Sequence, residues 1–584
     1  MAEKVFDLLD EMTIEPNQFT FTLLFNACAA VANDRAMKIG RKFLAEMPRN
    51  YQNNNITSTS AIDMLMKFGD VENAERIFRS IKTKDIITYN AMIKGYTENK
   101  IFEKALDLFD QIQLNLTNVT YTVIFNACAQ LCNDRATKIG RKLLDQMPDN
   151  YRNNIIILTS AMDMLMKFGD VENAESIFQS IKKKDANIYG ALMNGYNLND
   201  ESWKCFKIFE EMNKNNIAVD DIVWNIIIGA CSNTAMLHHC QYIMDRIPSN
   251  IQRNIQIQNS LIDMWGKCGS IEKAKSVFDS IDDRGTITYN VMINAFGLNG
   301  MGSQAVELYR QMPSNLRDRI SHICVLNACS HSALLHEART IFNEISIDCL
   351  SRLFVFDEAQ KLIDDYEKTN IPSIVMYMSL LSGARNNRNS NLSEKIYKRM
   401  KTLFPNEKES LTSGVVLLSN IYSSLGEYEQ AKNFRSNQIK ELGIKAKIGL
   451  SWSEIKGEIV RFKAHDHSHP QSTEIYAKIV RLKSKAIENG FIFDSSWITR
   501  RLNENETIES VLCGHSEILV IALNLIQEPV PKFIQVAKNL RVCGHCHEFT
   551  KIIAKIEQCD IVVRDANRIH HFYATGQCSC QDQF

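Results

Sequence analysis

A repeat of about one hundred residues occupies the first part of the chain and constrains its fold more than any other feature. The similar segments FTLLFNAC, YTVIFNAC, WNIIIGAC and HICVLNAC begin at residues 21, 121, 224 and 322. The segment MLMKFGDVENAE at 64–75 recurs unchanged at 164–175, and a third version lies within 259–278. Such self-similarity indicates an architecture in which each unit buries its apolar face only against its neighbours.

Each period divides into three helical hairpins. Segment 87–112 shows the pattern: an apolar helix, a polar turn, and a second helix with Ala105, Leu106, Leu108 and Phe109 on one face. Stacking of such hairpins predicts a superhelical α-solenoid. The small residues of the recurring Asn-Ala-Cys motif suit close helix packing. We therefore predict that four cysteines are core residues rather than metal ligands: Cys28, Cys128, Cys231 and Cys329.

Composition narrows the class of protein further. The 584 residues exceed what one compact core organises, and 24 Gly and 10 Pro are too few for a turn-rich all-β chain, so we expect mostly helix. A net charge of −1 argues against nucleic-acid binding dominated by Lys and Arg, but it leaves base recognition by hydrogen bonding and stacking. Sixteen Cys without a secretory signal favour reduced thiols and metal sites over a disulfide scaffold.

The chain contains no apolar run near the roughly 20 residues that span a bilayer, so we expect no membrane association. No transit peptide is visible at the N-terminus. Met1 leads directly into VFDLLDEM, which looks like the second helix of a repeat, and this favours a truncated start.

Units such as IITYNAMIKGYTENKIFEKALDLFDQI resemble pentatricopeptide repeats over about residues 1–345. Long, short and standard units alternate as in the plant-type triplet subclass: 18–54, 118–154 and 221–254; 55–85, 155–185 and 255–285; 86–117, 186–220 and 286–318. A tetratricopeptide scaffold is the alternative, but its W-x2-L-G-x2-Y signature is missing. The expected fold class is mainly α, with this solenoid followed by an α/β C-terminal domain.

The resemblance implies that each repeat reads one RNA base with the fifth residue of its first helix and the last residue of the repeat. The matching pairs are Thr22/Asn54, Thr59/Asp85, Asn90/Thr117, Thr122/Asn154, Thr159/Asp185, Gly190/Asp220, Asn225/Asn254, Asn259/Gly285 and Asn290/Asp318. By the family's code, Thr with Asn resembles an A reader, Thr with Asp a G reader, Asn with Asp a U reader and Asn with Asn a C reader. The two glycines break the pattern. Alternatively, several of these residues are only solvated helix starts or caps.

The periodicity weakens beyond residue 345. Residues 346–447 are interpreted as a degenerate repeat, whose first helix near 348 is shortened, followed by two hairpins that resemble the extension motifs of the family. Alternating apolar residues in 451–476 then predict a β-hairpin followed by a helix. Residues 448–584 are predicted to form a separate C-terminal domain that includes a gating segment.

Histidine and cysteine concentrate in the last hundred residues. His515-x-Glu517 opens an apolar helical run, and Cys543-x-x-Cys546 opens a second helix. One imidazole and two thiolates supply three tetrahedral ligands for zinc and leave the fourth position to water, while a nearby carboxylate that is not a ligand can move protons. This is the arrangement of zinc nucleobase deaminases. A structural zinc site with the same ligands is the alternative; a zincin protease is disfavoured because the second His of HExxH is missing.

The tail closely resembles the DYW domain of plant-type editing proteins from about residue 451 onward. The motifs are SHPQSTEIYAKI, GHSEILVIA, VAKNLRVCGHCHEFTKIIAKI and IVVRDANRIHHFYATGQCSCQDQF. The resemblance implies cytidine-to-uridine deamination in RNA, with Zn²⁺ held by His515, Cys543 and Cys546 and with Glu517 as general acid and base. The chain ends Asp582-Gln583-Phe584 instead of Asp-Tyr-Trp, and weakened activity is expected.

The resemblance also implies a second, structural zinc, so that two Zn²⁺ are expected per chain. Its candidate ligands are His547, one of His570 and His571, Cys578 and Cys580. Alternation along a strand would turn only one of the two adjacent histidines inward. Cys513 and Cys559 are predicted to be packing thiols. His465, Asp466, His467 and His469 are predicted to form a polar loop rather than a metal site.

The favoured function is sequence-specific binding of single-stranded RNA with C-to-U editing, and the family resemblance favours a mitochondrial or plastid location. The alternatives are an RNA-binding adaptor with a zinc-binding but silent tail, a protein-binding solenoid, and an endonuclease, for which no Asp cluster with metal-nuclease spacing is found. The transcript, helper proteins and oligomeric state are not specified by the sequence.

Overall fold

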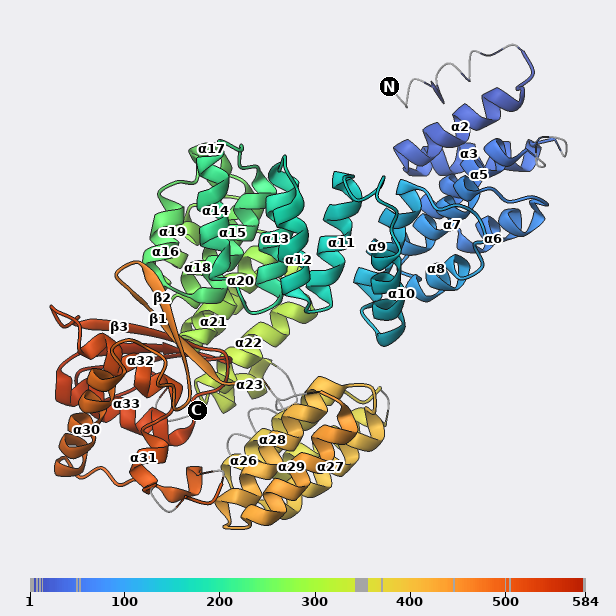
Figure 1. Cartoon of the computed structure of the whole chain (residues 1–584). Helices are drawn as coiled ribbons and strands as arrows, with labels where there is room; N and C mark the ends of the chain where they lie inside the picture. Colours follow the sequence, from blue (N-terminus) through green and yellow to red (C-terminus); the bar gives the residue numbers. More distant parts are fainter. Residues whose placement is uncertain are drawn as a thin grey trace. The chain divides into compact units, whose positions relative to one another are not determined.

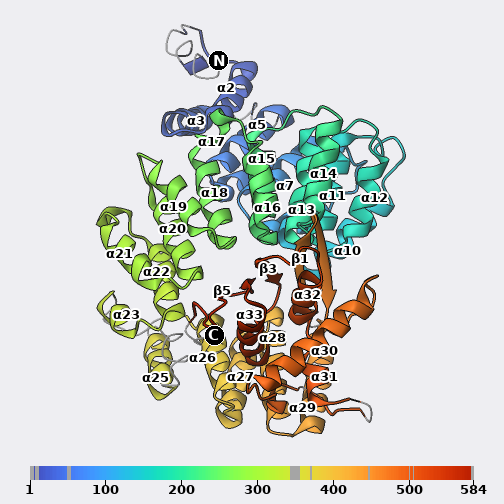
Figure 2. The same cartoon turned by 90° about the vertical axis from the view of Figure 1, so that its left-hand side faces the viewer.

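A computed structural model of the chain describes residues 5–6, 9, 12, 14–48, 51, 54–341, 356–368, 371–444, 447–498, 500–503 and 506–580. The chain forms two compact units, Met1–Ile226 and Ile227–Phe584, and each is described by itself (Figures 1 and 2). Among the described residues, no helix combines the length and apolarity that a membrane crossing requires.

The first unit is a series of antiparallel helical hairpins, as the repeat pattern predicts (Figure 1). Its helices are α2 (Gln18–Val31), α3 (Asp34–Glu46), α5 (Asn55–Lys67), α6 (Val71–Ser80), α7 (Ile86–Glu98), α8 (Phe102–Phe109), α9 (Asn118–Leu131), α10 (Asp134–Asp145), α11 (Ile155–Lys167), α12 (Val171–Ser180), α13 (Ala186–Leu198), α14 (Lys204–Lys214) and the start of α15 (Asp221–Thr234).

The recurring glycine of each short unit has a conformational reason. Gly69, Gly169 and Gly269 each end the first helix of a hairpin with φ between +74° and +76°. A side chain is strained in this left-handed region, whereas glycine adopts it readily. The glycines therefore fix the tight reversal that returns the second helix of the hairpin onto the first.

The second unit continues the hairpins with α16 (Leu237–Met244), α17 (Ser249–Gln252), α18 (Ile255–Lys267), α19 (Ile271–Asp279), α20 (Thr286–Leu298), α21 (Gly302–Gln311), η1 (Ser314–Leu316), α22 (Arg319–His331), α23 (Leu335–Ile341), α25 (Phe356–Glu367), α26 (Ile374–Asn386), α27 (Ser390–Leu403), α28 (Lys408–Ser424) and α29 (Tyr428–Leu442). Helices α25 to α29 share an apolar cluster around Tyr377, Leu381 and Leu418. The shortened helix expected near residue 348 lies outside the described residues.

The four cysteines of the recurring motif are fully buried, which confirms that they are core residues. Cys28, Cys128, Cys231 and Cys329 each have no solvent exposure. Burial raises the pKa of Cys28 to about 11 and that of Cys128 to about 12. Both therefore remain neutral thiols, as expected of side chains that pack helices together.

The last part of the second unit changes to α/β structure, which confirms the predicted hairpin and helix. Its elements are β1 (Leu450–Ile455), β2 (Glu458–Lys463), α30 (Ser472–Glu488), η2 (Ser495–Trp497), α31 (Ile508–Leu512), α32 (Ser516–Leu525), β3 (Phe533–Lys538), α33 (Gly544–Glu557), β4 (Asp560–Arg564) and β5 (Ile569–Phe572).

The strands form one sheet in the order β2-β1-β3-β4-β5. Only β3 and β4 run parallel, with Val536 opposite Val563, and α33 makes the crossover between them. Helix α32 is buried along its whole length, and its Ile518–Leu523 run joins the core with Phe549 of α33. The buried helix and the crossover helix bring their N-terminal ends to the same site.

Candidate active site and nucleic-acid interface

The first His/Cys cluster forms where α32 and α33 begin. His515 is the N-cap residue of α32, and Cys543 is the N-cap residue of α33, where its Sγ accepts the Cys546 amide at 3.5 Å. His515 Nδ1 lies 3.2 Å from Cys546 Sγ and 3.5 Å from Cys543 Sγ. One imidazole nitrogen and two sulfurs therefore converge, as the spacing of the sequence motifs predicts.

Glu517 belongs to the same cluster and is only 1% exposed. Both of its carboxylate oxygens accept hydrogen bonds from Lys538 Nζ at 2.6 Å, and Ser516 Oγ donates to one of them at 3.2 Å. Burial acts to raise the pKa of Glu517, but the Lys538 ammonium and His515 outweigh it and hold the pKa at about 2. The carboxylate is thus ionised although it is buried.

The donor chemistry of this cluster fits a zinc ion. The close Cys546 sulfur and His515 lower the pKa of Cys543 well below its ordinary value against the effect of burial, so a thiolate ligand is available. Two sulfurs and one imidazole nitrogen are ligands that zinc prefers. Glu517, already paired with Lys538, can remain outside the ligand set while staying within reach of a molecule bound there.

Lys538 is the residue of this site that sequence reasoning missed. It ends β3, directly after the buried Val536 and Ala537, and its side chain is 10% exposed. A lysine that ends an apolar strand in the same domain as a candidate catalytic carboxylate is the signal that could have identified it. The pairing itself depends on α32 packing against β3, which the sequence does not display.

A second cluster joins His547 on α33 to β5 and to the chain after it. His547 Nε2 lies 3.1 Å from Cys580 Sγ, Cys580 lies 3.3 Å from Cys578 Sγ, and Cys578 lies 3.9 Å from His570 Nδ1. All four side chains are buried. Hydrogen bonding from Cys578 and His547 lowers the pKa of Cys580 to about 2, so this thiol is ionised.

The two histidines are also oriented by carboxylates, an arrangement common around zinc ligands. His570 Nε2 lies 3.4 Å from Asp565, and His547 Nδ1 lies 3.1 Å from Glu548. His571 points the other way, with its Nε2 3.3 Å from Asn299 Oδ1. The structure therefore groups His570 with the cluster and leaves His571 out of it, as strand alternation allows.

The two other cysteines of this region lie in the core, as predicted for packing thiols. Cys513 and Cys559 are 3% and 2% exposed and belong to the apolar core. In the loop after β2, His467 stacks on Tyr476 and Asp466 accepts the Ser468 amide, and none of these loop side chains belongs to a metal-like group of the described residues. Asp582, Gln583 and Phe584 lie outside the described residues.

The second members of the predicted base-reading pairs are helix caps. Asn54, Asp85, Thr117, Asn154, Asp185, Asn254 and Asp318 are N-cap residues whose side chains accept amides of the next first helix, and Asp220 accepts the Val223 amide. Gly285 caps without a side chain. These residues therefore have the helix-capping role that is the alternative interpretation to base reading.

In two of the predicted pairs the two side chains also contact each other. Asn90 Nδ2 donates to Thr117 Oγ1, and Asn290 Nδ2 donates to Asp318 Oδ1, both at 3.2 Å. Among the described side chains, Asn90 Oδ1, Asn259 Oδ1 and Asn290 Oδ1 are buried acceptors without a hydrogen-bond partner. Because such groups are costly when unpaired, they mark positions where a ligand can supply a donor.

Unlike these asparagines, the threonines at the fifth position have side-chain oxygens that already take part in hydrogen bonds. Thr22, Thr122 and Thr159 donate to carbonyls of their own helices at 2.8–3.0 Å. Thr59 Oγ1 instead shares a hydrogen bond with Thr88 at 2.9 Å. These hydroxyls retain acceptor capacity but are already engaged. Gly190 offers no side chain, and Asn225 has partners of its own.

Exposed apolar side chains at the second position of the first helices were not predicted. They belong to Phe19, Ile56, Ile87, Val119, Ile156, Ile222, Ile287 and Ile320, which are 47–70% exposed. The signal is visible in the sequence as an apolar residue three positions before most of the fifth-position residues, Gly190 and Asn259 being the exceptions. Exposed apolar groups that recur near polar side chains form a surface on which the flat faces of nucleobases can stack.

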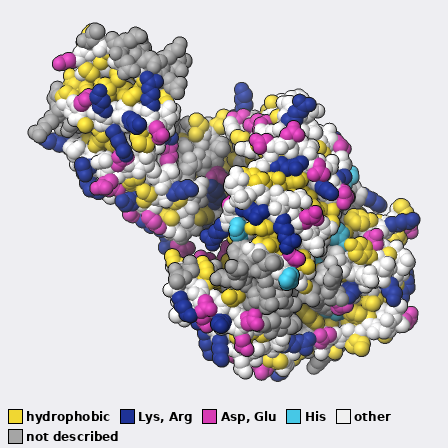
Figure 3. Space-filling view, turned by 180° about the vertical axis from the view of Figure 1, so that it is seen from behind, with side chains coloured by type: hydrophobic (Ala, Val, Ile, Leu, Met, Phe, Trp, Pro, Cys, Tyr) yellow, Lys and Arg dark blue, Asp and Glu magenta, His cyan; other side chains and the backbone are white. Residues whose placement is uncertain are grey.

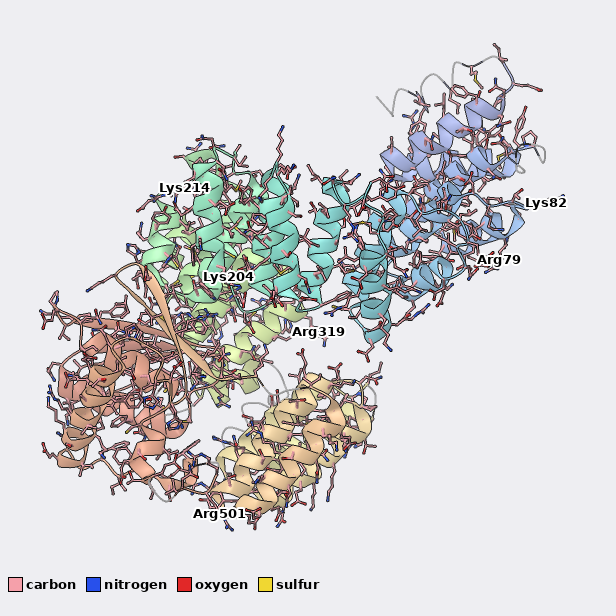
Figure 4. All side chains as sticks on the ribbon, in the orientation of Figure 1. Arg79, Lys82, Lys204, Lys214, Arg319 and Arg501 are labelled. Carbon is pink, nitrogen blue, oxygen red and sulfur yellow. The ribbon has the colours of Figure 1, made fainter. Side chains whose placement is uncertain are left out.

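Charged side chains are interspersed rather than gathered into one basic patch on the face shown in Figure 3. Two of the basic groups labelled in Figure 4 are paired: Arg79 with Glu75 at 2.6 Å and Lys204 with Glu175 at 2.7 Å. Such pairs contribute little to binding a polyanion. This agrees with the near-zero net charge and favours recognition through bases over counterion release.

Comparison with known families finds two kinds of match in the chain. The profile described as the DYW family of nucleic acid deaminases matches residues 490–584. Pentatricopeptide repeat profiles match residues 56–86, 84–130, 156–185, 188–217, 259–286, 287–315 and 361–403.

Two relatives from Arabidopsis thaliana match over most of their length. A pentatricopeptide repeat-containing protein named as mitochondrial is 30% identical over 89% of this chain and 84% of its own. Another, named as chloroplastic, is 28% identical over 100% of this chain and 73% of its own. The chain is also similar to the pentatricopeptide repeat protein PPR10 in a crystal structure with an 18-nt psaJ RNA element: the match is 14% identical, covers 90% of this chain and 82% of that one, and has a TM-score of 0.42.

Proposed function

Since this chain belongs to the pentatricopeptide repeat-containing proteins and ends in a DYW-type nucleic acid deaminase domain, we propose that it binds single-stranded RNA and converts selected cytidines to uridine. The observation that carries the proposal is a buried, ionised Glu517 within the same cluster as one imidazole and two sulfurs. A purely structural metal site does not require a buried carboxylate such as Glu517, which Lys538 keeps ionised.

In the proposed reaction cytidine and water give uridine and ammonia. His515, Cys543 and Cys546 would hold the zinc ion, which when bound acidifies water and polarises the reacting centre. Glu517 takes a proton from the attacking water and delivers protons to N3 of the ring and to the departing amine. Lys538 keeps the Glu517 carboxylate ionised and fixed in position before the reaction, which is the state a proton acceptor needs.

Base selection is proposed to depend on the fifth-position asparagines. The partnerless Oδ1 atoms of Asn90, Asn259 and Asn290 accept hydrogen bonds and suit bases that offer a donor on their Watson–Crick edge. The exposed apolar residues at the second positions pack against the base faces. In the standard unit 286–318, Asn290 with Asp318 is proposed to select U, as the resemblance implies.

The direct test is an editing assay with the full chain. An RNA that carries the bases matched to the repeats upstream of a C is incubated with the zinc-loaded protein, and the product is sequenced. Glu517→Ala is expected to abolish conversion while the zinc content and the RNA affinity stay unchanged. No conversion by the unaltered chain, with RNA binding intact, would favour the adaptor alternative, and strand cleavage would reveal a nuclease.

The proposed base selectivity is tested by comparing two variants of the repeats in an RNA-binding assay. Asn290→Ala should weaken binding most for RNAs with U at the position matched to 286–318, whereas Gly285→Ala, at a position without a reading side chain and with open space around it, should not change the base preference. Equal loss for all bases would contradict base reading. Because the relatives are named as mitochondrial or chloroplastic, we also propose an organellar location.

A further inference from the structure

A third group of metal-binding side chains lies outside both clusters described above, at a contact between α16 and β1 within the second unit. His238 and His239 are adjacent on α16, and Glu454 lies on β1. His238 Nδ1 is 2.7 Å from Glu454 Oε1, and His239 Nδ1 is 2.8 Å from Glu454 Oε2. The three ligand atoms lie within 4.8 Å of one another.

The backbones on both sides of this group are held in place. Trp452 Nε1, on the same strand as Glu454, donates to Thr234 O at 3.0 Å. Gln535 on β3 accepts the Leu237 amide at 2.9 Å and donates to Cys268 O at 3.0 Å. Arg564 on β4 donates to the carbonyls of Ser232 and Asn233 at 2.6 and 2.7 Å. These hydrogen bonds therefore hold the sheet and the helices around α16 in a fixed position relative to each other.

The group is accessible on one side and enclosed on the other. His239 and Glu454 are 12% and 11% exposed, whereas His238 is 72% exposed. His238 and Glu454 line a cavity of about 680 Å³, into which Gln241 and Lys273 also point. An ion can enter from this cavity, and water can complete its coordination.

We propose that His238, His239 and Glu454 bind a divalent transition-metal ion, with zinc the best match, that bridges α16 and β1. Two imidazole nitrogens and one carboxylate oxygen form a borderline donor set that zinc accepts. Ligands at zinc-bonding distances in a tetrahedral site are about 3.3 Å apart, so each of the two nitrogen–oxygen distances needs to lengthen by about half an ångström. Side-chain torsions of His238, which is mostly exposed, can supply this movement.

An ion at this position joins the repeat helices to the deaminase sheet. Hydrogen bonds alone leave two imidazoles as donors to one carboxylate, and the contact made by the mostly exposed His238 contributes little stability. A bound ion instead ties α16 to β1 and stabilises their contact by mass action. The site is independent of the proposed editing chemistry, since none of its residues belongs to the two His/Cys clusters.

The test uses the full chain dialysed against buffered zinc, with zinc per chain measured by elemental analysis. His238→Ala, His239→Ala and Glu454→Gln should each bind one equivalent less than the unaltered chain, whatever number the His/Cys clusters bind. His336→Ala, which removes an exposed histidine from α23, should bind the full number. Because His238 is mostly exposed, its loss leaves the packing intact and separates a metal effect from misfolding.

Two further measurements identify the site. Cobalt bound at the site of His238, His239 and Glu454 should add no thiolate-to-metal absorption, because this site contains no sulfur. Zinc should slow hydrogen exchange in α16 and β1 of the unaltered chain but not of Glu454→Gln. The same zinc content in the unaltered chain and in all three variants would overturn the proposal, as would zinc-independent exchange of α16 and β1.

Discussion

The buried ion pair between Lys538 and Glu517 gives the most demanding prediction. Lys538→Met removes the ammonium, keeps a side chain of similar length, and leaves the carboxylate without its cation at a position that is 1% exposed. Breaking a buried pair from one side typically costs about 3–5 kcal/mol, because the remaining charge is uncompensated. Glu517→Gln with Lys538→Met leaves no buried charge and should be distinctly less destabilised than Lys538→Met alone.

Local hydrogen exchange of the full chain is the suitable assay, since a protein of several units does not unfold in a single step. At about 1.4 kcal/mol per tenfold change, the loss predicts that amides of α32 exchange about 100-fold to a few thousand-fold faster in Lys538→Met. Exchange in α2, in the other unit, is the internal control and should not change.

The pH dependence of this effect has a definite sign. In the unaltered chain the pKa of Glu517 is about 2 against an ordinary 4.5, so its ionised form stabilises the fold above pH 4.5 and this contribution is lost as the pH falls through about 2. Without Lys538, burial raises the pKa of Glu517 above its ordinary value. The penalty of Lys538→Met should therefore be smaller at pH 5 than at pH 8, after correction for intrinsic exchange rates.

Two results would refute this reasoning. If α32 exchanges at the same rate in Lys538→Met and in the unaltered chain, Lys538 does not stabilise the buried carboxylate. If the double variant is as labile as Lys538→Met, the loss comes from packing of the lysine side chain and not from the charge left on Glu517.

Three further predictions address other parts of the fold. His570→Ala should remove one zinc equivalent from the second cluster, whereas His571→Ala should leave the zinc content unchanged, because only His570 lies in the cluster. Asn154→Ala should destabilise α11 by about 1 kcal/mol through loss of its N-cap, measured by exchange of α11, and Asn154→Ser should retain most of the stability. Gly169→Ala should cost about 1–2 kcal/mol for a left-handed residue, and Gly269→Ala more, because its added carbon would lie 3.3 Å from His571 Cε1; equal losses in the two hairpins would contradict the contact with His571.

Much of the site is local in sequence and could be predicted from it. His515 and Glu517 start one helix, and Cys543 and Cys546 start another, so their spacing alone places each pair at a helix end. The choice between His570 and His571 could not be made in this way. Both lie on β5, and only the packing of that strand against α33 on one side and Asn299 on the other separates them.

At the predicted base-reading positions, too, the sequence predicts one part of the site and the tertiary structure decides the other. The sequence predicts which residues occupy the fifth position and the end of each repeat, but not that the latter cap helices or that three asparagine oxygens are left without partners. These properties depend on how neighbouring repeats stack.

The repeat period, the helical hairpins, the buried cysteines and the two ligand motifs were determined by the sequence itself, because each follows from contacts between residues near one another in the chain. The tertiary structure alone decided the contacts between distant segments: Lys538 with Glu517, His571 with Asn299, and His238 and His239 with Glu454. These contacts form because α32 packs against β3 and the sheet packs against the repeat helices. This packing brings polar side chains from distant parts of the chain within hydrogen-bonding distance.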